Sequence, residues 1–185
     1  MGPLEHGTPL AVVIWHKESH PMYAAKKILV PLDYSDTSRA ALSAALQLAE
    51  DHDSELHILH VVDGMDQTLQ SQLDNNAEDT GLGPIIEAQE EAMREAVALE
   101  RERAAEAGKP LSDRPLKLRV TGGNWVDVTL QIIADEQLDL VVTATHGPKK
   151  GPLGRLLGSR SQKLLREATC SVWIVKPKGY PYLRD

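Results

Sequence analysis

Short apolar runs alternate with longer segments of helical periodicity between residues 27 and 175, and this alternation limits the chain to few folds. The runs have the length of buried strands: Ile28–Leu32, Glu55–Val62, Leu116–Val120, Leu138–Thr143 and Ser171–Val175. Helices are predicted at Thr37–Glu50 and Pro84–Arg103, around Val126–Ile133, and at Ser159–Ala168. Consecutive parallel strands require such crossovers, so the sequence predicts an α/β fold: an open, doubly wound, five-stranded parallel sheet with helices on both faces.

Composition narrows the possible partners of this chain. It has 185 residues, of which 42% are hydrophobic, enough for one buried core. Lys and Arg total 20 against 27 Asp and Glu, a formal net charge of −7. Nucleic acids and anionic membranes bind cationic protein surfaces preferentially, so neither is predicted as a general partner of this acidic chain.

Cys170 is the single cysteine and cannot form an internal disulfide, which fits a reducing compartment. No apolar run approaches the ~18 residues that a membrane helix needs. We therefore expect a cytoplasmic protein that does not insert into membranes.

The segments outside the alternating pattern divide the chain. Residues 1–21 are expected to be an N-terminal extension, 22–178 one domain, and 179–185 a tail. Within the extension, Ala11–Trp15 has the composition of a strand or a docking segment, although a flexible arm is the interpretation that termini favour. Residues 65–83 are polar and aperiodic and predict a long connection, either a lid or a disordered loop.

In sheets of this type, ligands bind at the carboxyl ends of the strands, where the strand order reverses direction. The first such loop, Pro31–Ser35, places Asp33 directly after a predicted strand. Its carboxylate could accept hydrogen bonds from a sugar hydroxyl or hold a metal. A cap at the entry of the next helix is an equally good interpretation of the spacing.

The second loop, Ala144–Ser159, is rich in glycine and leads into a predicted helix. Free backbone amides and a helix N-terminus favour phosphate binding, and Lys149, Lys150, Arg155 and Arg160 add local positive charge. A flexible loop with turn glycines explains the same residues. The loop matches neither the P-loop nor the GxGxxG fingerprint.

Four blocks in this order resemble the universal stress protein family: Lys27–Ser35, Leu59–Asp63, Asp139–Gly147 with Gly158–Ser159, and Leu164–Val175. The resemblance implies an adenine nucleotide alpha hydrolase-like sheet with strand order 3-2-1-4-5. It also implies a homodimer paired through the last strand, at Val172, Trp173, Ile174 and Val175.

For one branch of that family the resemblance implies bound ATP or AMP, with Mg²⁺ or Mn²⁺ accompanying the triphosphate. Asp33 then holds the ribose, the backbone of Val61 meets adenine, and Gly147, Gly158, Ser159 and Ser161 bind phosphates. Pro31, Ala144 and His146 complete the expected pocket. The chain departs from the family motif at Ala144, which replaces the first glycine, and by one extra residue between Gly147 and Gly158.

Several functions are compatible with this sequence. The first is a nucleotide-binding stress or regulatory protein. The others are a dimeric interaction module without a ligand, a slow ATPase or phosphotransferase, and a flavin-type binder of the same architecture. His146 could act as an acid or base, but no nucleophile–base pair is readable, so no catalytic residue is predicted.

Overall fold

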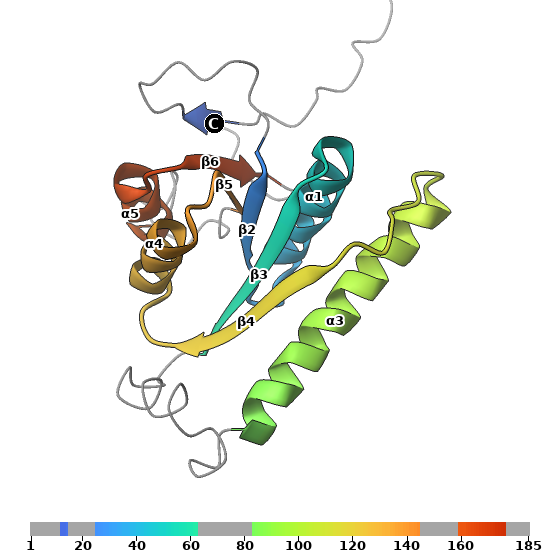
Figure 1. The fold of residues 1–185 in the computed structure, drawn as a ribbon, viewed down its shortest axis with the longest axis horizontal. Coiled ribbons are helices and arrows are strands. Elements are labelled where there is room, and N and C mark those ends of the chain that lie inside the picture. The colour runs from blue at the N-terminus through green and yellow to red at the C-terminus, as the bar shows by residue number, and fades with distance from the viewer. Residues whose placement is uncertain (1–11, 15–24, 63–82, 145–158, 177–185) are drawn as a thin grey trace, which may run out of the picture.

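The computed structural model describes residues 12–14, 25–62, 83–144 and 159–176 (Figure 1). The strands are β1 (Val12–Ile14), β2 (Lys27–Pro31), β3 (Glu55–Val62), β4 (Leu116–Gly122), β5 (Leu140–Ala144) and β6 (Ser171–Val175). The helices are α1 (Asp36–His52), α3 (Gly83–Glu106), α4 (Trp125–Glu136) and α5 (Ser159–Glu167). Within these parts, none of the helices combines the length and the apolar character that a membrane span requires.

The strands form a six-stranded sheet in the order β1-β6-β5-β2-β3-β4. β2 lies in the interior of the sheet, where it pairs in parallel with β3 on one side and with β5 on the other. β4 extends the parallel set beyond β3, and β6 extends it beyond β5. Counted from β2, this is the order 3-2-1-4-5, so the predicted parallel sheet is confirmed.

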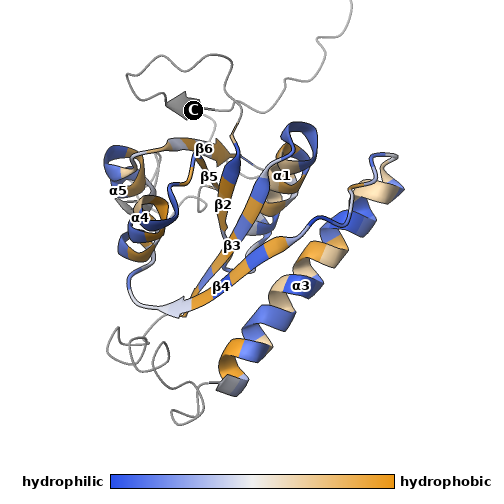
Figure 2. Ribbon diagram, viewed as in Figure 1, coloured by the Kyte–Doolittle hydropathy of each residue, from blue (hydrophilic) through white to orange (hydrophobic). Residues whose placement is uncertain are grey.

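Helices cover both faces of the sheet, α1 and α3 on one and α4 and α5 on the other (Figure 1). The sheet therefore separates two hydrophobic clusters. One contains Val30, Leu42 and Ile58 beneath α1 and α3, and the other contains Leu29, Ile133 and Leu164 beneath α4 and α5. The hydropathy colouring shows apolar residues concentrated on the strands and on the inner faces of the helices (Figure 2). Successive side chains of β2 thus pack into opposite hydrophobic layers, as the alternation of side chains along a strand requires.

Local signals fix where the helices begin. Ser35 caps α1 by accepting a hydrogen bond from the Ser38 amide at 3.2 Å. Asn124 caps α4 by accepting from the Val126 amide at 2.9 Å. Both caps use oxygens of short polar side chains to satisfy amides that have no partner within the helix.

β5 begins two residues later than predicted, at Leu140. Gln137 ends α4 in the left-handed conformation (φ 52°), and the next residue still bonds back to the helix. Asp139 accepts hydrogen bonds from the amides of Lys26 and Lys27, each at 2.9 Å, and so ties the start of β5 to the start of β2.

β1 adds a strand that lies outside the parallel set. Val12–Ile14 pairs antiparallel with β6, in the register Val12↔Ile174, Val13↔Trp173 and Ile14↔Val172. The sequence allowed a strand here but favoured a flexible arm. The structure thus places three residues of the predicted extension on the outer edge of β6.

Candidate functional site

Three neighbouring parallel strands end at the same edge of the sheet. β2 ends at Pro31, β5 at Ala144, and β3 continues to Val62. The chain passes from β2 to β3 on one side and later returns to β5 on the other, so the strand order reverses at β2. This is the position at which open α/β sheets bind their ligands.

Asp33 lies in the loop that leaves this edge and enters α1. Its Oδ1 accepts hydrogen bonds from the Ser35 amide at 3.1 Å and from the Ser35 hydroxyl at 2.5 Å, and its own amide donates to Ser38 Oγ at 3.4 Å. The helix cap is Ser35, and Asp33 organises the turn before it. The residue is exposed, so a carboxylate fixed by the loop lies at the rim of the crevice.

Tyr34, the next residue, has the left-handed backbone conformation (φ 60°), which is unfavourable for a bulky side chain. Its hydroxyl donates to the backbone oxygen and Oε1 of Gln89 on α3, at 3.0 and 3.1 Å. Its ring centroid lies 4.8 Å from that of His60, whose Nδ1–H donates to the Leu32 carbonyl at 2.8 Å. Partial burial raises the pKa of the Tyr34 hydroxyl and so favours the protonated form that donates these bonds. Tyr34 thereby anchors the Asp33 loop to β3 and α3.

Sequence analysis assigned no role to Tyr34. A left-handed residue after a strand is usually signalled by glycine or asparagine, and neither occurs there. The contacts that hold the conformation come from residues 26 and 55 positions away along the chain.

The other predicted residues of this edge lie close to the hydrophobic layers. Pro31 is buried, and Val61 is half-buried against the cluster beneath α4 and α5. Ala144 is 7% exposed and belongs to the cluster beneath α1 and α3. Its methyl group, which the first glycine of the family motif would lack, is therefore packed in the core.

α5 follows the predicted glycine loop. Because β6 runs parallel to β5, α5 returns the chain across the sheet, and its N-terminus at Ser159 lies toward the edge where β5 ends. Ser161 is buried within its first turn. His146, Gly147 and Gly158 lie outside the described residues, as does the side chain of Ser159. The described residues therefore bring Pro31, Asp33, Val61 and Ala144 to one edge.

The cysteine and the two histidines of β3 are the remaining residues that could carry chemistry, and their surroundings indicate structural roles. Cys170 is buried, and desolvation raises the pKa of its thiol to about 12, which is the environment of a small core residue. His57 and His60 lie on opposite faces of β3, because side chains alternate along a strand. Within the described residues, no group of three His, Cys, Asp or Glu is placed to hold a metal ion.

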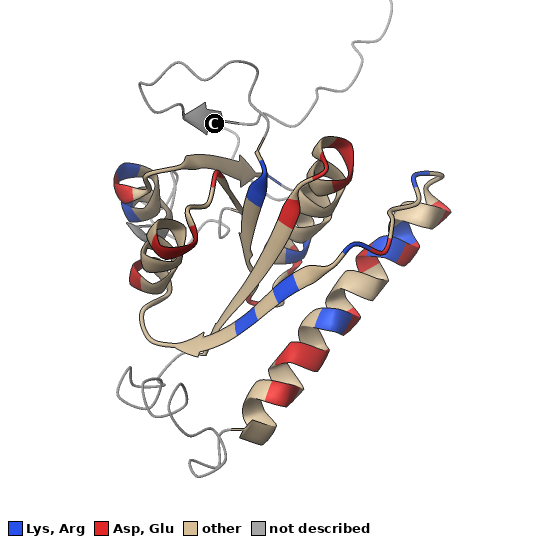
Figure 3. Ribbon diagram, viewed as in Figure 1, with Lys and Arg blue, Asp and Glu red and all other residues tan. Residues whose placement is uncertain are grey.

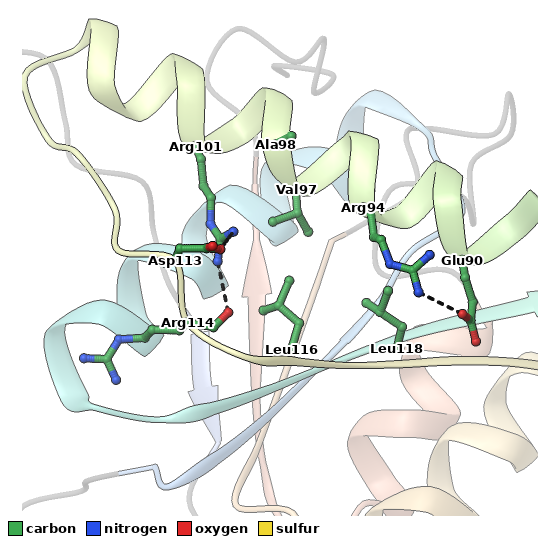
Figure 4. A pocket seen from close by; sticks show the side chains of 9 residues that line it. All are labelled: Glu90, Arg94, Val97, Ala98, Arg101, Asp113, Arg114, Leu116 and Leu118. Carbon is green, nitrogen blue, oxygen red and sulfur yellow. Dashed lines mark hydrogen bonds and ion pairs between the residues drawn. The ribbon is translucent and has the colours of Figure 1, made fainter. Parts of the chain in front are cut away.

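A second concave region, the α3–β4 groove, has a volume of about 500 Å³ (Figure 4). Leu116, Leu118 and Val97 supply its apolar wall. Arg94 bonds Glu90 at 3.0 Å, and Arg101 bonds Asp113 at 2.5 Å. Because these guanidinium groups are neutralised by neighbouring carboxylates, the groove lacks the concentrated charge of an anion site.

Comparison with known proteins agrees with this architecture. The sequence model of the Universal stress protein family matches residues 24–176. A universal stress protein of Thermus aquaticus is 32% identical over 152 residues, which cover 82% of this chain and 98% of that protein. One of Methanocaldococcus jannaschii is 28% identical over 151 residues, 82% of each chain.

Solved structures share the fold. The universal stress protein UspA from Lactobacillus plantarum superposes with a TM-score of 0.56 at 25% identity, covering 83% of this chain and 99% of that one. A universal stress protein in complex with cAMP has a TM-score of 0.55 at 25% identity and covers 83% and 98%. The doubly wound sheet, the ordered motifs and these matches lead to one conclusion: the chain belongs to the universal stress protein family.

Proposed function

We propose that this universal stress protein binds an adenine nucleotide, ATP or AMP, in the crevice between β2 and β5 and acts as a stress-response regulator. The observation that carries the proposal is the fixed carboxylate of Asp33 at the reversal point of the strand order. A carboxylate there is suited to accept hydrogen bonds from ribose hydroxyls. The related protein that was solved with cAMP supports an adenine nucleotide as the ligand class.

The neighbouring strands supply the remaining contacts. The backbone of Val61 near the end of β3 would meet the base, because a main-chain amide and carbonyl can read the edge of adenine. The N-terminus of α5, with Ser159 and Ser161, would receive phosphates together with Gly147, Gly158 and His146. The Ala144 methyl packs in the hydrophobic core, which supports a phosphate site beside it.

A divalent ion, Mg²⁺ or Mn²⁺, would be held largely by the phosphates, since these ions commonly keep several waters and few protein ligands. Two copies would pair through β6, at Val172–Val175. The lone buried Cys170 fits a reducing, cytoplasmic location. We assign no hydrolytic step to this site.

Isothermal titration calorimetry of the full chain with ATP, AMP and cAMP, each with and without Mg²⁺, tests the nucleotide site. Asp33→Ala is expected to weaken binding about tenfold or more, because a hydrogen bond to a charged group contributes roughly 1.5–3 kcal/mol. Tyr34→Phe removes the bonds to Gln89 and is expected to weaken binding less, because the carboxylate remains.

Asp51→Ala is the matched control. It removes the same charge, but Asp51 lies in the last turn of α1, at the opposite edge of the sheet from the loop that holds Asp33. Equal nucleotide affinities of Asp33→Ala and the parent chain would show that Asp33 does not contact the ligand. No heat with any nucleotide at millimolar concentration would favour the interaction module without a ligand.

A further inference from the structure

β6 is an apolar strand at the end of the parallel set. It contains no charged residue, and Val172 and Ile174 are 2% and 3% exposed in the cluster beneath α4 and α5. Trp173 and Val175 pack partly buried against the opposite cluster. An uncovered edge of this composition would present unpaired amides and carbonyls and would recruit another strand.

In this chain that edge is occupied by β1. The pairing joins residues about 160 positions apart in sequence and is the single antiparallel pairing of the described sheet. β1 also precedes residues 24–176, the part that matches the family model. The covering strand therefore lies outside the part of this chain that matches the family model.

The covering is short. In the described part of the chain, β1 has three residues, and its register covers the central three of the five residues in β6. A strand of this length contributes few ladder hydrogen bonds, and other contacts must add to its stability. Such a strand protects an edge and is also replaceable by a longer competitor.

A second copy of β6 is that competitor. Two copies related by a two-fold axis can pair antiparallel through the same edge, which makes a self-complementary interface. The backbone groups used for that pairing are those that bond β1, so both cannot occur on one edge.

We propose that β1 is an intramolecular cap that competes with a second copy of this chain for the outer edge of β6, and thereby holds back dimerisation. Release of β1 exposes the edge and permits pairing of β6 with β6. The inference rests on the proposed pairing of two copies through β6 and is independent of the nucleotide site.

Val13→Pro in the full chain tests the competition, because proline removes the amide at the centre of β1. Sedimentation equilibrium is expected to show self-association about tenfold or more tighter than in the parent chain, since the competent fraction rises. Val13→Ala keeps the amide and is expected to behave more like the parent chain.

The other outcomes separate the inference from the proposed dimer. Dimers of equal strength in both chains would refute the cap and leave the β6 interface standing, whereas two monomeric chains would refute both. A dimer that is lost in Val13→Pro would mean that β1 is exchanged between copies, which also overturns the intramolecular cap.

A cross-link gives an independent measurement if Val13→Pro folds poorly. Ile14→Cys combined with Val172→Cys, at positions that lie opposite in the register, is expected to form a disulfide within one chain and keep the oxidised protein monomeric. Cys170 is buried with a raised pKa and competes little for this reaction. Failure to cross-link, or a covalent dimer on a non-reducing gel, would contradict the proposal.

Discussion

The two ends of the parallel sheet are protected in different ways. β4, at one end, carries Lys117 and Arg119 and has no strand on its outer side among the described residues, whereas β6, at the other, has no charge and is covered by β1 (Figure 3). Charged side chains discourage strand addition permanently, but a short covering strand can leave. The comparison indicates that β4 is built to stay free and β6 to be paired.

The cations of β4 are held on one face of the sheet. Lys117 Nζ lies 2.5 Å from Glu55 Oε1, and Arg119 Nη1 lies 3.8 Å from Glu136 Oε1 on α4. With His57 they line a small cavity of about 280 Å³ between the sheet and α4. Side chains are therefore less completely buried near β4 than near β6. Substitutions in the two strands should lower the free energy of unfolding by different amounts.

The largest expected effect comes from truncating one apolar residue in each strand. Ile174→Ala in β6 is expected to lower the free energy of unfolding by about 2–5 kcal/mol, because the side chain is 3% exposed in a packed cluster. Leu118→Ala in β4, where the side chain is half-buried, is expected to cost clearly less. Urea unfolding of both variants measures the difference. Equal losses would mean that both strands are equally buried, against the comparison.

The strands also differ in how well the sequence predicts them. The bounds of β3 and β6 agree with the predicted runs because each run is continuous and ends at turn-forming residues. β1 was ambiguous because three residues show no periodicity, and its partner lies at the far end of the chain. Local patterns specify a strand, but only long-range packing specifies that an extension pairs with it.

In the candidate site, too, one residue could be placed from the sequence and another could not. Asp33 could be placed at the edge because it follows directly after a buried strand. The anchoring of Tyr34 could not, because its backbone conformation depends on Gln89 and His60, which the chain brings from other elements. The sequence therefore indicated which loop places a carboxylate at this edge, whereas the rigidity of that loop depends on tertiary contacts.

A smaller effect is expected from acidification near β4. Burial lowers the pKa of His57 below its usual 6.5, although Glu55, 2.7 Å from Nε2, opposes the shift. The folded protein then binds fewer protons than the unfolded chain, so stability decreases as the pH falls through about 6.5. Lys117 lowers the pKa of Glu55, which adds a separate loss below about pH 4.5.

His57→Gln tests the first of these losses. Urea midpoints measured at about pH 7 and about pH 5.5 should differ less in the variant than in the parent chain. His52→Gln, at an exposed histidine of α1, is the matched control and should keep the parent dependence. A parent-like dependence in His57→Gln would assign the acid sensitivity to other groups.

The smallest expected effect on stability comes from the cations of β4. Lys117→Thr combined with Arg119→Thr removes two exposed ion pairs, which contribute little to stability and are weakened further by salt. If these charges protect the edge, the variant should nevertheless self-associate more strongly at high concentration, because its β4 then resembles an unprotected strand. Lys163→Thr removes an ion pair with Asp127 between α5 and α4, away from both edges, and should leave association unchanged. Sedimentation velocity distinguishes these results, and a monodisperse double variant would show that charge is not what keeps β4 free.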